Sequence, residues 1–368
     1  MKKLILSATL LLSVATFAQK DELKVLKKIY AKDEISEKDL EAYKTASDAL
    51  QGLASEESDK VYAKFYKVMY PTIVLASKGA KVTPQDQMNL YTSEFIKEYG
   101  TTIDETIAFE KKSGKKIYTD DLIEEKTVFK KNLITFAFSL NTAKKYKDAA
   151  VVFYNVYLFD KKGEGKSLQN AAVLAVQGED YASALKYYEE LLASDYLENG
   201  IIYYAINKAT GIEEEISSRE ERTKFISLNL YEKPRDFKVS NNKPEFMRVL
   251  AILYRQNNDF DKAKEIYAKA RVLAPENEDL KKGEFDLYFN LGYNGLNEEE
   301  KLVNEINASR GDKKKYDELM AKRKAMFLST IPNFEKAYAL NPDDENTKSI
   351  LKMAYEATGQ PEKAKAIK

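Results

Sequence analysis

The sequence predicts an all-α protein built as an array of paired helices, and three observations support this fold class. The 368 residues exceed the usual size of one compact core, which favours several domains or a repeat array. The chain has only 14 glycines and 8 prolines, so few residues interrupt helices. Apolar residues recur at i, i+3, i+4 and i+7 in successive segments, whereas no long run alternates as a strand does. We therefore expect helices throughout and no strands.

The composition excludes several classes of function. Histidine, cysteine and tryptophan are absent, so the chain lacks the imidazole and thiolate groups of haem ligation, thiolate zinc sites, disulfides and Ser-His-Asp or Cys-His catalysis. Lysine plus arginine and aspartate plus glutamate number 59 each, so no excess charge favours nucleic acid. We expect no cofactor and no metal site.

Residues 1–18 have the pattern of a secretory signal peptide, because Lys2 and Lys3 precede an apolar run from 4 to 17. We predict cleavage after Ala18, which leaves 57 basic and 59 acidic side chains and a net charge of −2. The run is shorter than the ~20 residues that span a bilayer, and no cysteine follows the cleavage site, so neither a membrane anchor nor a lipoprotein is expected. We expect a periplasmic protein that does not insert into the membrane, with the extracellular space as the alternative.

Residues 19–129 predict a degenerate helical region. Short amphipathic patterns occur at 23–30, 40–53 and 62–70. Pro71, Gly79 and Pro84 are expected to interrupt the helices, because proline removes a backbone hydrogen bond and glycine favours turns. Helix should resume over 85–112, and residues 114–118 predict an exposed loop.

Residues 246–275 contain the clearest repeat unit. Two amphipathic helices flank a break at residues 257–259, and the second ends before Pro275. The small Ala263 and Ala270 allow the helices to approach closely. The unit resembles a tetratricopeptide repeat (TPR), with Trp and Gly replaced, because these residues match its characteristic positions: Met247, Leu250, Ala251, Tyr254, Ala263, Tyr267 and Pro275.

The same frame recurs over residues 130–368. Ala149 and Ala184 are 35 residues apart, and Ala184 and Ala263 are 79 apart, which equals two periods of about 34 plus an insertion. In the degenerate repeat we expect helices near 201–206 and 225–230, and Pro332 should kink or restart the long helix. The resemblance implies a right-handed superhelical solenoid and extends to exported TPR proteins of the Bacteroidota. The predicted units are 130–163, 165–198, a degenerate repeat at 199–243, 244–277, an elongated helical pair at 278–344, and a truncated repeat at 345–368.

Charged clusters are expected to be solvated surface. The acidic runs 213–215 and 298–300 lack calcium-loop spacing, and neighbouring helical residues point to different faces. The basic residues 313–315 and 322–324 favour a charged helix face, with phosphate or anionic-lipid contact as the alternative. Residues 163–167 superficially resemble a phosphate-binding loop, but the first glycine is missing and a helix precedes them.

The TPR resemblance implies a ligand groove lined by positions five, nine and twelve of each first helix. The ninth position is apolar in four repeats, and the pattern of a carboxylate clamp is absent, so we expect a groove for an amphipathic helix or an extended apolar peptide. Alternatively, these side chains pack between neighbouring repeats, or the N-terminal helices fill the groove. The predicted groove residues are Ile134, Phe138, Asn141, Gln169, Val173, Val176, Arg248, Ile252, Arg255 and Met353.

These features predict a non-enzymatic scaffold or adaptor of the bacterial cell envelope, which holds another protein by burying apolar surface. The 25 tyrosines add weak support, because aromatic residues are common at interfaces. A soluble glycan- or substrate-binding helical-repeat protein is the alternative, followed by a carboxylate-dependent hydrolase. A hydrolase needs two carboxylates that converge in a cleft, whereas an adaptor needs an exposed apolar groove.

Overall fold

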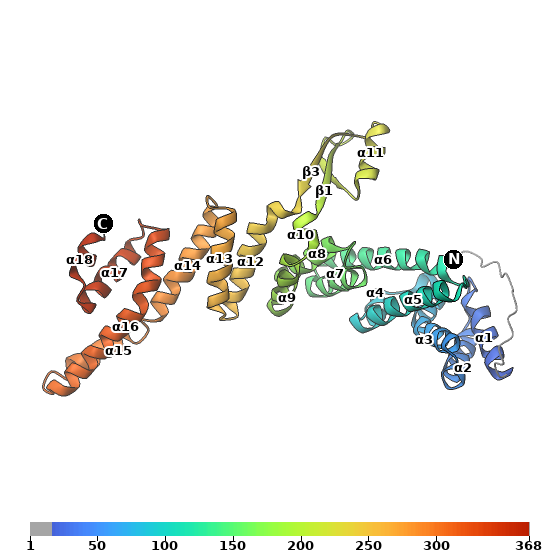
Figure 1. Ribbon diagram of the computed structural model, residues 1–368, viewed down its shortest axis with the longest axis horizontal. Helices are drawn as coiled ribbons and strands as arrows, with labels where there is room; N and C mark the ends of the chain where they lie inside the picture. Colours follow the sequence, from blue (N-terminus) through green and yellow to red (C-terminus); the bar gives the residue numbers. More distant parts are fainter. Residues whose placement is uncertain (1–16, 368) are drawn as a thin grey trace. The chain divides into compact units, whose positions relative to one another are not determined.

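The computed structural model of the protein describes residues 17–367, which are helical apart from one small sheet (Figure 1). The chain divides into two compact units, Met1–Tyr187 and Tyr188–Lys368. Most of the predicted signal peptide, residues 1–16, lies outside the described residues, and the first helix begins at Phe17, just before the predicted cleavage site. No helix within residues 17–367 combines the length and apolar character that crossing a bilayer requires.

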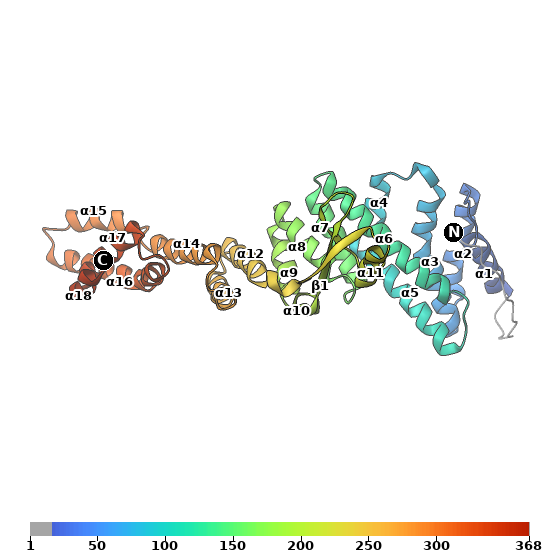
Figure 2. The same cartoon turned by 90° about the horizontal axis from the view of Figure 1, so that it is seen from above.

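The first unit begins with five helices, of which α1, α2 and α3 lie side by side (Figure 2). Pro71 lies inside α3, so the prediction of an interruption there was wrong. The buried side chains of Val68, Met69 and Ile73 flank it, and their packing outweighs the hydrogen bond that proline removes. A short 3-10 turn, Gly79–Lys81, separates α3 from α4. The helices are α1 (Phe17–Tyr30), α2 (Glu37–Leu53), α3 (Glu57–Ser77), α4 (Pro84–Leu90) and α5 (Ser93–Ser113).

A buried carboxylate joins α5 to α6 (Thr119–Thr142). Glu110 is 0% exposed, and it accepts hydrogen bonds from the backbone N–H of Tyr118 at 3.0 Å and of Thr119 at 2.9 Å. The hydroxyls of Thr119 and Tyr62 donate to it at 2.6 and 3.0 Å. The first N–H groups of a helix have no partner within the helix, so Glu110 supplies the acceptor that α6 needs. The continuous α6 also crosses the predicted boundary between residues 129 and 130.

Helix pairs follow in the repeat frame. The first unit continues with α7 (Tyr146–Phe159), α8 (Gly165–Gln177) and α9 (Tyr181–Leu192), and the boundary between the units lies within α9. The turn inside a pair contains one residue with left-handed backbone: Lys144, Glu179 and Asn258 have φ of 60°, 58° and 60°. Their spacing equals that of Ala149, Ala184 and Ala263, each of which is 0% exposed. Recurring turns and buried alanines therefore define the helix-turn-helix unit of the TPR fold class.

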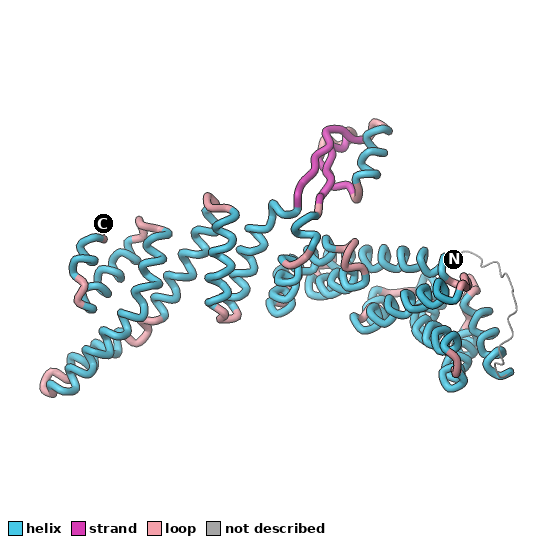
Figure 3. The backbone as a smooth tube through the Cα atoms, in the orientation of Figure 1, coloured by secondary structure: helices cyan, strands magenta, loops and turns pink. Residues whose placement is uncertain are grey.

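The prediction of a helical repeat at 199–243, and of a chain without strands, was wrong. After α10 (Asp195–Asn199), the chain forms a three-stranded antiparallel sheet in the order β2-β1-β3, drawn in magenta in Figure 3. Ile and Tyr favour strands, and a short apolar run is compatible with either a strand or a buried helix. The elements are β1 (Ile201–Asn207), β2 (Glu213–Ile216), α11 (Arg219–Ser227), β3 (Tyr231–Lys238) and the 3-10 turn Val239–Asn242.

Arg222 attaches α11 to the sheet. Its side chain is buried, forms an ion pair with Asp236 at 2.6 Å, and donates to the backbone oxygens of Tyr204 and Arg235 at 3.3 and 2.9 Å. The central strand β1 pairs Tyr203 with Ile216 on one side and with Asp236 on the other. The sheet and α11 therefore form one small module inserted between helical repeats.

The second unit then resumes the helix pairs. The elongated pair is present, because the 28-residue α16 packs against both α14 and α15 (Figure 2). Pro332 lies inside α16 and does not restart the helix, since buried Phe327, Ile331 and Phe334 flank it and hold the helix in the core. The helices are α12 (Lys243–Gln256), α13 (Phe260–Leu273), α14 (Glu278–Asn294), α15 (Glu299–Ala308), α16 (Lys313–Leu340), α17 (Glu345–Thr358) and α18 (Pro361–Ala366).

Candidate functional site

The predicted groove residues belong to the first helices of repeats in both units. Six lie on α6 and α8 of the first unit, and four lie on α12 and α17 of the second. The ninth-position side chains of Phe138, Val173 and Met353 are 49%, 43% and 40% exposed, whereas Ile252 is half-buried. Phe138 lies edge-on to Phe153 of α7, with ring centroids 5.0 Å apart. The N-terminal helices of the first unit thus leave half of the Phe138 side chain accessible.

The predicted positions on α6 belong to a longer stripe. Steps of three or four residues place side chains on one face of a helix, and this face of α6 extends from Ile123 to Asn141. Ile123 is 50% exposed at one end, and Phe138 is 49% exposed near the other. The repeat frame begins at residue 130, so the TPR resemblance predicts only the last three positions of the stripe, although the helical spacing of the other three is visible in the sequence. The stripe consists of Ile123, Thr127, Lys130, Ile134, Phe138 and Asn141.

The N-terminal half of this stripe borders a cleft of about 330 Å³ between α5, α6 and the end of α7. Asp104 and Lys111 line it from α5, and Lys126 and Lys130 line it from α6. The wall formed by α7 includes the ring of Phe159, whose centroid lies 5.2 Å from Nζ of Lys126. The cleft therefore combines an aromatic wall with charges of both signs.

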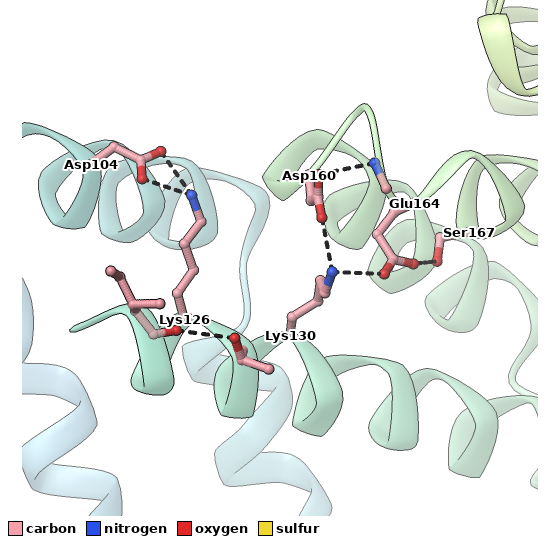
Figure 4. A network of polar contacts seen from close by, with 9 residues as sticks. Asp104, Lys126, Lys130, Asp160, Glu164 and Ser167 are labelled. Atoms are coloured by element: carbon pink, nitrogen blue, oxygen red, sulfur yellow. Dashed lines mark hydrogen bonds and ion pairs between the residues drawn. The ribbon is translucent and has the colours of Figure 1, made fainter. Parts of the chain in front are cut away.

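A network of ion pairs fills one side of the cleft (Figure 4). Nζ of Lys126 donates to both carboxylate oxygens of Asp104 at 2.7 and 2.9 Å. Nζ of Lys130 contacts Asp160 at 2.8 Å and Glu164 at 3.1 Å, and the Ser167 hydroxyl donates to Glu164 at 2.7 Å. Lys130 thus connects α6 to the segment that joins α7 and α8.

The pKa values agree with this pairing. Burial alone lowers the pKa of Lys130, but its hydrogen bonds to Asp160 and Glu164 outweigh that effect, so the pKa is raised. The hydrogen bond from Lys130 lowers the pKa of Asp160 from its usual value. Both groups are therefore charged at neutral pH, and their charges compensate each other within the network.

The predicted charged clusters are engaged in local contacts. Glu213 accepts a bidentate pair from Arg235 at 2.9 and 2.6 Å, on a strand rather than on the expected helix. Glu299 accepts from Arg323 at 2.9 and 2.6 Å, and Lys313 pairs with Asp317 at 2.9 Å. Within residues 17–367, no three acidic side chains lie close enough together to hold a metal ion.

In the second unit, the charge of Arg248, one of the predicted groove residues on α12, is compensated by a neighbouring carboxylate. The Arg248 guanidinium forms two hydrogen bonds with Glu245 at 2.8 and 2.7 Å, which raise its pKa. Ile252 and Arg255 follow at intervals of four and three residues on the same face and are half-buried. Met353 lies on α17, in the last repeat of this unit.

The chain is similar to solved TPR structures at low sequence identity. No protein-family model and no curated protein matches the sequence. The TPR domain of P58(IPK) is 11% identical with a TM-score of 0.30, covering 95% of this chain and 81% of that one. A TPR protein from Parabacteroides merdae is 14% identical with a TM-score of 0.25, covering 92% and 98%. Yeast Tom70 is 13% identical with a TM-score of 0.24, covering 96% and 60%. The fold assignment rests on the helix pairs described above.

Proposed function

We propose that the protein is a non-enzymatic scaffold that holds a segment of a partner protein against the first helices of its repeats. The observation that carries this proposal is the exposure of apolar side chains at equivalent positions of consecutive repeats, Phe138 at 49% and Val173 at 43%. Helix pairs in an array form an extended preformed surface, and a helical or extended peptide binds such a surface through regularly spaced apolar anchors.

The charged side chains near the stripe set the register of the partner in this proposal. Lys126 and Lys130 are already paired with Asp104 and Asp160. These paired charges at the edge of the stripe therefore orient the partner and do not attract it by a strong net electric field. Ile123 and Phe138 are 15 residues apart on α6, which corresponds to about 22 Å along a helix. A partner segment of about four helical turns matches that distance.

A pair of double variants tests the groove. Phe138→Asp with Val173→Asp places charge at the exposed apolar positions, and Val151→Asp with Leu158→Asp does the same at exposed positions on α7, which are 38% and 37% exposed. Crosslinking pull-downs from envelope fractions should lose one reproducible partner with the first variant and keep it with the second. Circular dichroism must show both variants folded. Equal recovery of every partner by the two variants would count against the groove.

We further propose that the protein is exported, which is supported by the charge and hydropathy pattern of residues 1–18. Mass spectrometry of the N-terminus of the native protein tests this proposal. Cleavage after Ala18 leaves Gln19 as the first residue, and recovery of residues 1–18 in the native protein would contradict export by this route.

A further inference from the structure

A second cavity lies beside α6, on the side away from the stripe that extends from Ile123 to Asn141. It measures about 190 Å³, opens to solvent, and is lined by residues of α3, α4, α5 and α6 and by Tyr91 after α4. Successive helical residues are rotated by about 100°, so Glu125 in this cavity and Ile123 in the stripe are about 160° apart around α6. Sites for drug-sized molecules measure roughly 300–1,000 Å³, so this cavity fits one side chain or a very small molecule.

Three aromatic rings form the inner part of the cavity. Tyr91, Tyr99 and Phe129 line it and are 8%, 1% and 7% exposed. The ring centroids of Tyr99 and Phe129 are 4.3 Å apart, and those of Tyr91 and Phe129 are 5.6 Å apart. Clustered aromatic rings attract organic cations, because the ring faces carry partial negative charge.

A carboxylate completes the lining. Glu125 is half-buried, and it accepts hydrogen bonds from the hydroxyls of Tyr99 at 2.6 Å and Tyr30 at 2.7 Å, one on each oxygen. Each carboxylate oxygen can accept about two hydrogen bonds, so both retain capacity. Within residues 17–367, no lysine or arginine forms an ion pair with Glu125. The Glu125 carboxylate therefore has room for a further donor and, among the described residues, no lysine or arginine within ion-pair distance.

The mouth of the cavity is amphipathic. Val128 lines it and is 50% exposed, and the exposed amide of Asn132 lies seven residues, or about 10 Å, from Glu125 along α6. A lysine-like chain has a cation at the end of a flexible four-carbon stem. Such a chain would extend its stem along the rings from Asn132 towards Glu125.

We propose that this cavity binds a protonated primary amine with a short aliphatic stem, whose ammonium group pairs with Glu125 and whose stem contacts Tyr91, Val128 and Phe129. Two sources share this chemistry, a free alkylammonium ion and a lysine side chain of a peptide. The inference does not depend on the proposed scaffold function, because none of the cavity residues belongs to the stripe of α6 that extends from Ile123 to Asn141.

A ligand-observed NMR titration of the full chain at pH 7 tests the inference with n-butylammonium as the probe and n-butanol as its neutral counterpart. The amine should bind about tenfold more tightly than the alcohol, as expected for an added charge and cation–π contribution. N-acetyl-lysine-N-methylamide distinguishes the sources: tighter binding than n-butylammonium indicates a peptide side chain, and weaker binding indicates a free amine. Equal binding of amine and alcohol, or no binding of the amine, overturns the proposal.

A matched pair of variants locates the binding. Val128→Arg places a cation at the mouth of the cavity and should abolish amine binding, whereas Ile123→Arg changes an equally exposed residue on the opposite side of α6 and should leave binding unchanged. Glu125→Gln should remove the preference for the amine over the alcohol. If Glu125→Gln fails to fold, the variants Val128→Arg and Ile123→Arg still test the location of the site, because equal amine binding by these two variants contradicts the assignment.

Discussion

Replacing Glu110 tests whether a charged, buried carboxylate holds α5 and α6 together. Four donor groups converge on it: the backbone N–H groups of Tyr118 and Thr119 and the hydroxyls of Tyr62 and Thr119. Hydrogen bonds to charged groups contribute about 1.5–3 kcal/mol, whereas neutral bonds contribute about 0.5–1.5 kcal/mol. In Glu110→Gln the amide nitrogen cannot accept a hydrogen bond, so one of the four contacts is lost or reversed and the other three weaken by about 1 kcal/mol each, while relief of the buried charge offsets part of this loss. We expect a net destabilisation of about 2 kcal/mol.

Glu110→Ala should cost more, about 4 kcal/mol, because two buried backbone N–H groups then lack an acceptor at about 1–3 kcal/mol each. Urea unfolding followed by circular dichroism measures both variants, and hydrogen exchange in residues 93–142 assigns the change to α5 and α6. Glu105→Ala is the control, because Glu105 lies on the same helix and is 50% exposed in its ion pair with Lys64, so it should cost less than about 0.5 kcal/mol. A Glu110→Gln variant as stable as the control would refute the role of the charge.

Three further predictions concern packing, pH and the inserted module. Gly283→Ala should destabilise the second unit by about 1–3 kcal/mol in urea unfolding, because the added Cβ would lie 2.6 Å from the Tyr267 hydroxyl oxygen. Gly52→Ala is the control, because a Cβ added there meets no atom within 4 Å, and it should stabilise the protein by about 0.5–1 kcal/mol. Burial raises the pKa of Tyr118 to about 12, so the folded state binds its proton more tightly. The contribution of this group to the free energy of unfolding should stay constant below pH ~10 and fall from there to pH 12, so Tyr118→Phe should reduce the loss of stability over that interval in urea unfolding. Arg222→Met should weaken the inserted sheet by about 1–3 kcal/mol, because two backbone oxygens lose a charged donor while the half-exposed Asp236 regains water, and this should appear as faster hydrogen exchange in residues 201–238 while α12–α18 keep their protection.

The sequence alone predicted the repeats, because the small residues that allow helices to pack closely must recur at the repeat period. Ala149, Ala184 and Ala263 occupy this position and are fully buried. The spacing of 79 residues between the last two predicted a degenerate repeat with an insertion, whereas a sheet module occupies that interval. Its internal structure was not readable, since a short continuous apolar run such as residues 201–206 does not distinguish a strand from a buried helix segment.

Prolines also show that local sequence does not decide whether a helix continues. Local chemistry predicts an interruption at Pro71 and a kink or restart at Pro332, yet both prolines lie inside helices whose buried neighbours hold them in place. A lost hydrogen bond is a local cost, and whether packing exceeds it depends on the side chains that tertiary structure brings against that turn.

The two candidate sites also differ in how far the sequence alone predicts them. The helical spacing from Ile134 to Asn141 was sufficient to place a stripe on one face of α6, because that spacing is a property of the helix itself. The aromatic cavity beside Glu125 was not predictable, because Tyr91 after α4 and Tyr99 of α5 line it from separate segments, and Tyr30, 95 residues from Glu125 in the chain, donates to that carboxylate. The sequence by itself determined the helices, their period and the residues on each face, since these follow from local geometry. Only the tertiary structure decided which tyrosines meet which carboxylate, because such contacts depend on how distant helices pack.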